Sequence, residues 1–325
     1  MDGRHQSERV GADEGSNVER LGGSTSSTRS SQSETDRAVG SHSSVRLSSR
    51  TPLVWIKLGG SLITNKTSRE ELRLDILTAI ASTIKSLSSR VKILIGHGSG
   101  SFGHFYASEF NIRAGVSRDQ EWMGFALTAD SAARLHRRVV SALLLEGVPA
   151  IGIQSSCLLT CRNGKVVSGN LESVSRALES ELVPVVYGDV CFDQVLGGTV
   201  VSTEELFEYM LGFLSPCRIV IAGETLGVFD RNPDRFPDAK LIEDIDKTKF
   251  ESIRQGLGHS RGVDVTGGML SKVSLCIDMI ERRPGLQIII CSGLEPRQLS
   301  RAIQGERIGT LIQGHKPNSS AIEFH

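Results

Sequence analysis

The sequence lacks an excess of either charge, because its 325 residues carry 37 Lys and Arg against 37 Asp and Glu. This balance excludes the broad positive field with which many proteins attract nucleic acids or anionic membranes. It also lacks any run of the roughly 18–20 apolar residues that a membrane-spanning helix needs. We therefore expect neither a nucleic-acid nor a membrane partner. The absence of an apolar stretch near the N-terminus favours the cytoplasm over secretion.

Cysteines and aromatic residues are also scarce. Aromatic residues make up 5% of the chain, and the six cysteines have neither zinc nor redox spacing. We expect no metal site built from protein side chains, and we expect the thiols to remain reduced, as in a cytoplasmic protein. Any anion that the protein binds must be held by a local site.

The first 50 residues differ from the rest of the chain. They are rich in Ser, Gly, Arg and Glu and show neither the period of a strand nor that of a helix. Such a segment cannot bury enough apolar surface to offset the entropy of ordering it. We therefore expect residues 1–50 to be a disordered tail and residues 51–325 to form the folded domain.

Two kinds of periodicity alternate from residue 53 onward. Short apolar runs predict buried strands, at 53–58, 91–95, 149–153, 182–187, 218–222, 286–290 and 310–312. Helical spacing of apolar residues predicts helices, at 68–87, 119–146, 171–179, 203–214, 268–280 and 296–303. Strands separated by helices form right-handed βαβ units, so we expect an α/β fold with an open, mostly parallel sheet sandwiched by helices. Asn163-Gly164 and Gly197-Gly198 predict the turns of two additional β-hairpins.

Ligands of such sheets bind beyond the carboxyl ends of the strands, so the loops there are the candidate sites. The first is Lys57-Leu58-Gly59-Gly60-Ser61, with Lys66 a few residues further on. Paired glycines let backbone N–H groups approach a phosphate, and the lysines add positive charge. The alternative is an ordinary glycine turn with two solvated lysines.

The second loop, Gly96–His104, follows the second strand and contains four glycines, two serines and two histidines. It predicts an anion site at the start of a helix, although the order of a P-loop is absent. Gly98, Gly100 and Gly103 match G-x-G-x-x-G, but a dinucleotide fingerprint needs an acidic residue at the end of the following strand, about 20 residues later. Here that region, Arg113–Glu121, is polar and runs into a helix. His104 at the mouth of this loop is a candidate phosphate ligand.

The third loop is Asp264-Val265-Thr266-Gly267-Gly268-Met269, with Lys272 one turn into the helix that follows. Glycines at a helix start again suit a phosphate, and Lys272 would point back towards it. The alternative is an ordinary helix start with a surface lysine.

Together, the three loops resemble the amino acid kinase family, over roughly residues 53–312. Within that family the string His97–His104 is most similar to the isopentenyl phosphate kinases. Supporting stretches are Gly59–Lys66, Gly124–Thr128, Val139–Leu143 and Tyr187–Val190. The resemblance implies transfer of the γ-phosphoryl group of ATP, with Mg²⁺, to isopentenyl phosphate, which yields isopentenyl diphosphate for isoprenoid biosynthesis. It also implies a homodimer packed through a helix.

The resemblance assigns a role to each candidate residue. The catalytic side chains would be Lys57, Lys66, His104 and Lys272. The acceptor phosphate would be bound by Gly98, Gly103, His104, Gly188 and Asp189, in a half that spans about residues 51–200. The nucleotide would be bound by Lys57, Gly59, Gly60, Ser61, Ser99, Glu224, Gly267, Gly268 and Lys272, and residues 201–325 would form the nucleotide-binding half. Phe105, Tyr106, Phe125 and Thr128 would line an apolar pocket, or else pack in the core.

Two segments depart from the family pattern. Ser202-Thr203-Glu204 stands where relatives have Ser-Gly-Asp, so Glu204 would orient the lysines through a longer side chain. Glu224-Thr225-Leu226 replaces the more usual Thr-Asp-Val-Asp of the nucleotide loop. We expect activity to survive because all three lysines and His104 are present. The alternatives are a kinase for another small phosphate or phosphonate, a kinase for a carboxylate, a nicotinamide-dependent oxidoreductase, and a member of the family without catalytic activity.

Overall fold

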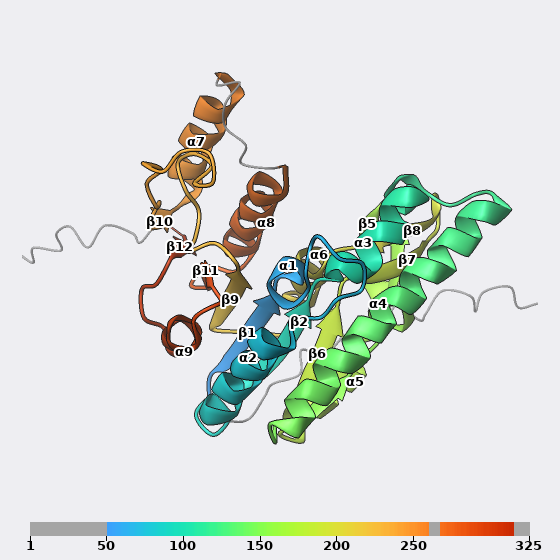
Figure 1. Cartoon of the computed structure of the whole chain (residues 1–325), viewed down its shortest axis with the longest axis horizontal. Coiled ribbons are helices and arrows are strands. Elements are labelled where there is room, and N and C mark those ends of the chain that lie inside the picture. Colours follow the sequence, from blue (N-terminus) through green and yellow to red (C-terminus); the bar gives the residue numbers. More distant parts are fainter. Residues whose placement is uncertain (1–50, 260–266, 315–325) are drawn as a thin grey trace, which may run out of the picture. The chain divides into compact units, whose positions relative to one another are not determined.

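The computed structural model describes residues 51–259 and 267–314, which lie within one compact unit of the chain, residues 44–325. The predicted tail, residues 1–50, lies outside the described residues. Within them, a large sheet of eight strands is accompanied by a smaller sheet of four (Figure 1).

The large sheet has the strand order β10-β12-β11-β9-β1-β2-β6-β3. Its strands are β1 Leu53–Leu58, β2 Lys92–His97, β3 Ala150–Gly152, β6 Val183–Tyr187, β9 Arg218–Gly223, β10 Asp244–Ile245, β11 Gln287–Ser292 and β12 Thr310–Gln313. All neighbouring strands are parallel except β11 and β12. The predicted α/β class with a mostly parallel sheet is therefore confirmed.

Helices cover both faces of this sheet. The helices of the described residues are α1 Gly60–Ile63, α2 Leu74–Leu87, α3 Gly100–Glu109, α4 Asp119–Leu145, α5 Glu172–Glu179, α6 Thr203–Met210, α7 Lys247–His259, α8 Gly267–Arg282 and α9 Pro296–Gln304, with 3₁₀ turns η1 Ile112–Ala114 and η2 Ser155–Cys157. In the part of the chain that the structure describes, none of them has the length and apolarity to cross a membrane.

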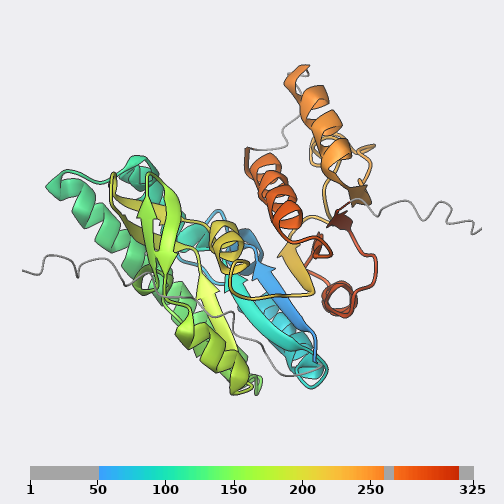
Figure 2. The ribbon, with the colours of Figure 1, turned by 180° about the vertical axis from the view of Figure 1, so that it is seen from behind.

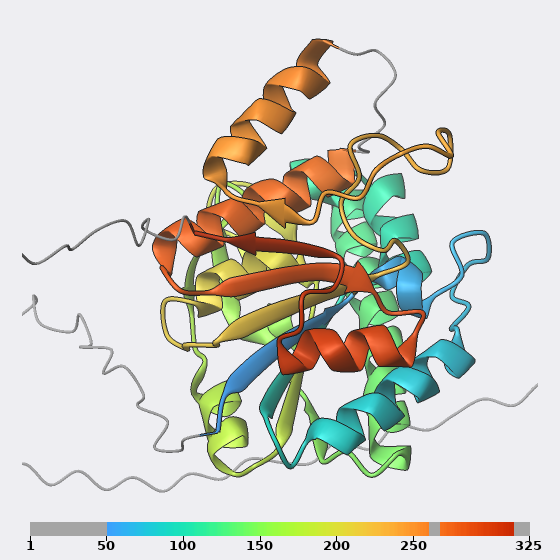
Figure 3. The same ribbon diagram turned by 90° about the vertical axis from the view of Figure 1, so that its left-hand side faces the viewer.

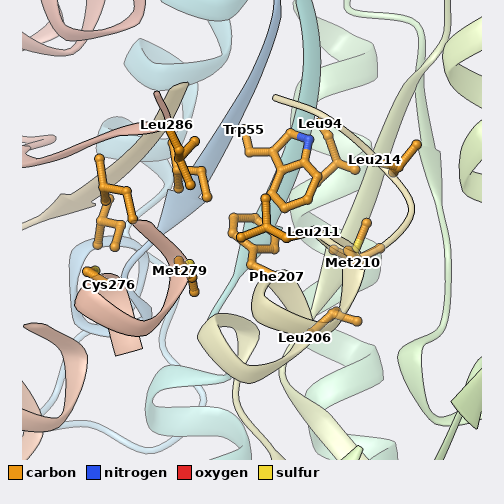
Figure 4. Packing of buried hydrophobic residues seen from close by; sticks show 14 of the residues in the cluster. Trp55, Leu94, Leu206, Phe207, Met210, Leu211, Leu214, Cys276, Met279 and Leu286 are labelled. Atoms are coloured by element: carbon orange, nitrogen blue, oxygen red, sulfur yellow. The ribbon is translucent and has the colours of Figure 1, made fainter. Parts of the chain in front are cut away.

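Alternate residues of β1 belong to two separate cores. Trp55 lies in a cluster with side chains of α5, α6 and α8, where its ring is 5.0 Å from that of Phe207 (Figure 4). Val54 and Ile56 lie in the other cluster, with α2, α4 and α9. Figures 2 and 3 show the same arrangement from behind and from the side, with α8 on one face of the sheet and α2 and α9 on the other. Because both faces are covered, the central strands β1, β2, β6 and β9 are mostly buried and apolar, as the sequence indicated.

The smaller sheet, in the order β5-β4-β7-β8, contains both predicted hairpins. Its strands are β4 Leu159–Arg162, β5 Lys165–Gly169, β7 Asp189–Asp193 and β8 Gly197–Val201. The turn predicted at Gly197-Gly198 is wrong, because both glycines belong to β8. The chain reverses before them, where the carboxylate of Asp193 accepts the N–H groups of Val195 and Leu196, each at 2.8 Å.

The helix predicted at 68–87 begins only at Leu74. Residues before it fold back instead, with an antiparallel bridge between Thr64 and Leu72 and a left-handed Glu70 at φ 55°. Left-handed backbone cannot continue into a right-handed helix, which explains the late start. We also did not predict α7, whose 13 residues contain only three large apolar side chains, at Phe250, Ile253 and Leu257.

Candidate active site

The carboxyl ends of the central strands are in register, so they lie side by side at one edge of the sheet. Leu58 of β1 pairs with His97 of β2 and with Ala222 of β9, and His97 also pairs with Tyr187 of β6. The glycine after each strand end continues the ladder: Gly59 N donates to Ala222 O at 2.8 Å, Gly98 N to Leu58 O at 3.0 Å, and Gly188 N to His97 O at 3.0 Å. The register of the sheet therefore brings the first two predicted glycine loops and Gly188 to one edge.

The first two loops lie in direct contact. A Cβ on Gly60 would lie 2.4 Å from Gly100 N, and one on Gly98 would lie 3.0 Å from Gly60 N. Gly100 itself has φ +51°, a conformation that side chains disfavour. Only glycine permits this approach, which sets the start of α1 beside the start of α3.

Thr64 joins the two loops through its hydroxyl. The hydroxyl donates to Gly60 O at 2.8 Å and accepts the amide of Ser101 at 3.0 Å. Ser61 lies in α1, and Ser99 is the residue before α3. Gly103 lies within α3, where a Cβ would meet the side chain of Ser99 at 2.7 Å, so close packing explains this glycine.

Lys57 and Glu204 form a buried ion pair at this edge. Lys57 Nζ lies 2.8 Å from Glu204 Oε1, and their side chains are 9% and 11% exposed. Ser202 caps α6 by accepting the amide of Glu205 at 3.1 Å, which fixes Glu204 in the first turn. Burial alone would raise the pKa of Glu204, but the charge of Lys57, helped by Lys272, holds it below its usual value. The carboxyl is therefore ionised and attracts both lysines.

Lys272 approaches the same carboxylate from α8. Burial lowers its pKa, as does the charge of Lys57, and Glu204 acts in the opposite direction. Gly267 and Gly268 form the start of α8. The rest of the predicted loop, Asp264–Thr266, lies outside the described residues.

Lys66 lies on the nucleotide side of the predicted site. Its Nζ is 2.8 Å from Glu224 Oε2, in the loop after β9, and the Lys66 side chain is 68% exposed. Arg73 binds the other oxygen of the same carboxylate at 2.9 Å. Lys66 also contributes to the repulsion that lowers the pKa of Lys272. The structure thus brings the three predicted lysines to one edge, each beside a carboxylate.

His104 projects from α3 near this group, with an exposed side chain. Loss of hydration where the ring lies against the protein lowers the pKa of His104, the charge of Lys57 lowers it further, and Glu204 raises it. The imidazole therefore lies within electrostatic range of the Lys57–Glu204 pair. It is well placed to donate a hydrogen bond to an anion.

Gly188 and Asp189 lie at the end of β6, but only Gly188 faces a loop of the site. A Cβ on Gly188 would lie 3.3 Å from Thr203 N. The carboxylate of Asp189 is buried and accepts the amides of Val190 at 2.8 Å and Ser156 at 3.3 Å. Burial raises the pKa of Asp189. Its side chain holds the β7 backbone in place.

A buried stack of three rings supports the second glycine loop from beneath. The ring of Tyr187 lies 4.3 Å from that of His136 and 5.5 Å from that of His97. His97 Nε2 lies 3.0 Å from His136 Nδ1, and His97 Nδ1 lies 3.1 Å from Gly98 O. These partners imply that both Nδ1 atoms carry hydrogens, so both rings are neutral.

Acid is expected to destabilise the fold through this histidine pair. Burial lowers the pKa of His97 to about 4 and that of His136 to about 3, from 6.5 in the unfolded chain. Between pH 6.5 and about 4, each histidine is therefore protonated in the unfolded chain but not in the folded one. Over this range each histidine lowers the free energy of unfolding by about 1.4 kcal/mol for every unit by which the pH falls. Urea unfolding between pH 7 and 5 tests this, with His136→Gln as the comparison. Equal slopes in both proteins would contradict the assignment.

The sequence was also compared with those of known protein families and curated proteins. Residues 52–292 match the amino acid kinase family. The chain belongs to this family. Among curated members, it is 34% identical over 270 residues to the isopentenyl phosphate kinase of Methanothermobacter thermautotrophicus, an alignment that covers 81% of this chain and 99% of that protein. The isopentenyl phosphate kinase of Arabidopsis thaliana is 33% identical over 197 residues, which cover 56% of this chain and 59% of that protein.

Solved structures of the family superpose on the same region. A structure described as isopentenyl phosphate kinase has a TM-score of 0.69 and 32% identity, and the match covers 80% of this chain and 100% of that one. A carbamate kinase from Giardia lamblia bound to AMP-PNP has a TM-score of 0.58 at 15% identity, covering 82% and 99% respectively, and supports the fold alone.

Several residues that shape the site were missed in the sequence. Thr203 donates its hydroxyl to His97 O at 2.7 Å, and Arg73 binds Glu224. Thr64 accepts the amide of Ser101, and Glu70 accepts the hydroxyl of Ser131, so both hold the segment around Lys66. Each acts across dozens of residues, and no local pattern marks such a contact. The one available signal was the proximity of Thr64 and Thr203 to the recognised motifs.

Proposed function

We propose that this chain is an ATP-dependent kinase that phosphorylates isopentenyl phosphate to isopentenyl diphosphate. The observation that carries the proposal is the group of three lysines around Glu204 and Glu224, beside His104, at the edge where four glycine-bearing strand ends meet. Such a local concentration of cations in a chain of zero net charge suits a site for two phosphate-bearing molecules. Near-complete alignment with isopentenyl phosphate kinases supports this substrate.

The reaction needs alignment and charge neutralisation more than it needs covalent chemistry. An oxygen of the acceptor phosphate attacks the γ-phosphorus of ATP, a new P–O–P bond forms, and the bond to the β-phosphate oxygen breaks. ADP leaves with the electron pair of that bond. Because the acceptor oxygen is already deprotonated in the phosphate dianion, no general base is required.

Each basic side chain has a part in this transfer. Lys57 and Lys272 would neutralise the nucleotide phosphates, held in place by the Glu204 carboxylate between them. Lys66 would exchange its Glu224 partner for the transferring phosphoryl group. His104 would donate to the acceptor phosphate. In this proposal, residues 51–200 supply most of the acceptor side, and residues 201–325 most of the nucleotide side.

Mg²⁺ is expected to enter with ATP. The ion keeps much of its coordination from phosphate oxygens and water when it binds with a nucleotide. The site fits this mode of binding. Glu204 and Glu224 are both ion-paired with basic side chains, so the phosphates rather than these carboxylates would supply most of the Mg²⁺ ligands. Mg²⁺ would add further neutralisation of the phosphate charge.

An apolar cluster between α4 and the smaller sheet lies on the acceptor side. Ile112, Val116, Phe125 and Val190 form it, and Phe125 is only 7% exposed. Phe125 and Thr128 are thus packed in the interior, while Phe105 is 46% exposed. We propose that the short hydrocarbon chain of the acceptor lies against the outer side of this cluster, where a carboxylate substrate would find no polar partner.

We also propose that the protein is a cytoplasmic homodimer packed through a helix. In support, Leu144 and Leu145 at the end of α4 are 51% and 86% exposed, and Ile151 of the edge strand β3 is 41% exposed. An apolar surface at a sheet edge favours association with another copy. Light scattering during gel filtration should give twice the mass of the chain.

The acceptor is tested by initial rates with ATP-Mg²⁺ and a panel of acceptors: isopentenyl phosphate, dimethylallyl phosphate, fosfomycin, UMP and glutamate. We expect isopentenyl phosphate to have a kcat/KM at least about 100-fold above those of UMP and glutamate, because their polar groups would be buried against apolar side chains. Equal or faster turnover of glutamate would favour a carboxylate kinase, which the 28–29% identity to glutamate 5-kinases over about half the chain also motivates.

A further inference from the structure

The segment that carries Lys66 is a folded loop with two anchors. Thr64 and Leu72 close its base as an antiparallel bridge, and Asn65 N donates to Glu71 O at 2.9 Å. Inside it, Asn65 Oδ1 accepts the amide of Thr67 at 3.1 Å and its hydroxyl at 2.8 Å. We call residues 64–72 the Lys66 loop.

One anchor lies on the nucleotide side. Glu224, after β9, binds Lys66 at 2.8 Å and Arg73, just beyond the loop, at 2.9 Å. Arg73 N also donates to Ile63 O at 2.9 Å. This anchor fixes the loop to the part of the sheet edge where the nucleotide is proposed to bind.

The other anchor lies on the acceptor side and uses Glu70. Glu70 Oε1 accepts the hydroxyl of Ser131 at 2.9 Å and also an N–H of Arg134, while Arg134 Nε lies 3.3 Å from Oε2. Ser131 is completely buried in α4. Next to it, the guanidinium of Arg69 lies 4.1 Å from the centre of the Phe105 ring, on the helix that carries His104.

The backbone at Glu70 indicates that this anchor is maintained by its contacts. Its φ of 55° lies in the left-handed region, which costs a residue other than glycine free energy and persists only where the surroundings impose it. Burial would raise the pKa of Glu70, but its hydrogen bond with Arg134 and the charge of that residue lower it. The carboxylate is therefore ionised and bound in a forked geometry.

We propose that Glu70 is a positioning residue for Lys66: by binding Ser131 and Arg134 of α4, it holds the acceptor-side end of the Lys66 loop. This inference rests on the proposed function, in which Lys66 neutralises the transferring phosphoryl group. The Lys66 side chain is 68% exposed and is not held by surrounding packing. The position of its ammonium group therefore depends on the loop that carries it. With both anchors in place, the loop spans from the nucleotide side to the helices of the acceptor side, and its lysine lies between the two substrates.

Kinetics of the full chain test this role. We expect Glu70→Gln to lower kcat about 10- to 100-fold, because small displacements of a charged group from a reacting centre cost that much. KM for ATP and for isopentenyl phosphate should change less than about 3-fold, since the phosphate-binding groups remain. Ser131→Ala, which removes one of the hydrogen bonds, should give a smaller loss.

Two further measurements separate positioning from general stability. Arg134→Gln should lower kcat like Glu70→Gln, and the double variant should lose no more than either single one, because both remove the same contact. Arg134 also pairs with Asp130, so Glu70→Gln leaves it a partner and should keep the thermal midpoint. Glu172→Gln, which breaks the exposed pair with Arg176 on α5, is the matched control and should leave kcat within about 2-fold.

Hydrogen exchange provides a readout without turnover. Amides of residues 65–71 should exchange faster in Glu70→Gln than in the unmodified chain, while those of α5 should not change. Unchanged kcat and exchange in Glu70→Gln, or losses of activity that simply follow the thermal midpoint, would overturn the proposal. If the unmodified chain transfers no phosphoryl group to any acceptor, the proposed function fails, and the exchange experiment still decides whether Glu70 holds the loop.

Discussion

Replacing Lys57 with methionine is expected to lower kcat about 10³-fold. Lys57 is buried at the end of β1 and bound to Glu204 at 2.8 Å, so it is a fixed cation that needs no reorganisation when phosphate charge develops. Loss of one such group typically costs two to three orders of magnitude. Steady-state rates with ATP and isopentenyl phosphate measure the effect.

The same substitution should also destabilise the fold, by about 3 kcal/mol, because it leaves the Glu204 carboxylate buried without its main partner. The double variant Lys57→Met/Glu204→Leu separates the two effects. Removing both charges should restore most of the stability, since buried pairs can be replaced by apolar residues, but not the activity. Recovery of kcat in the double variant would show that Lys57 serves folding rather than phosphoryl transfer.

Replacing His104 with alanine is expected to lower kcat/KM for isopentenyl phosphate about 100-fold, while KM for ATP stays within about 3-fold. The imidazole lies near Lys57 and Glu204 and is proposed to donate to the acceptor phosphate. A hydrogen bond to a charged group is worth about 1.5–3 kcal/mol, which corresponds to about 10- to 150-fold. His104→Gln keeps a donor and should recover part of the loss.

Ser108→Ala, one turn further along the exposed part of α3, is the control for changes in that helix and should behave like the unmodified chain. An unaltered kcat/KM for the acceptor in His104→Ala would remove this residue from the site. An equal loss for ATP and for the acceptor would place it between the two substrates instead.

The position of the candidate site could be predicted from the sequence because it depends on parallel strands. The apolar runs at 53–58, 91–95, 182–187 and 218–222 are each followed directly by a glycine. Parallel pairing places the carboxyl ends of such strands at one edge of the sheet. In the observed register, Leu58 pairs with His97 on one side and with Ala222 on the other. Local pattern and a topological rule were sufficient here.

The contacts that hold the candidate site in place could not be predicted from the sequence, because they join segments that are distant in the chain. Glu70 meets Ser131 61 residues away, and His97 meets His136 39 residues away. The left-handed backbone of Glu70 also has no marker, since a glutamate gives no signal of positive φ. As a result, apolar spacing extended the predicted helix back through the Lys66 loop.

The departure at Thr203-Glu204 is accommodated by the fold. Thr203 lies in the first turn of α6 and its φ is not positive, so the position does not need glycine. Its hydroxyl binds His97 O at 2.7 Å and adds a contact to the second glycine loop. The longer Glu204 side chain reaches Lys57 directly. The lysine-orienting role expected of this carboxylate remains a prediction, which the Lys57 and Glu204 variants test.

The proposed reaction requires Lys57, Lys66, Lys272 and His104 to meet around two facing phosphate groups. A crystal structure of the chain with a non-hydrolysable ATP analogue, Mg²⁺ and isopentenyl phosphate tests this most directly. We predict that the three ammonium groups lie within about 3 Å of nucleotide phosphate oxygens, and that the imidazole lies equally close to the acceptor phosphate. A complex in which Lys66 stays bound to Glu224, or in which His104 faces away from the acceptor phosphate, would contradict it.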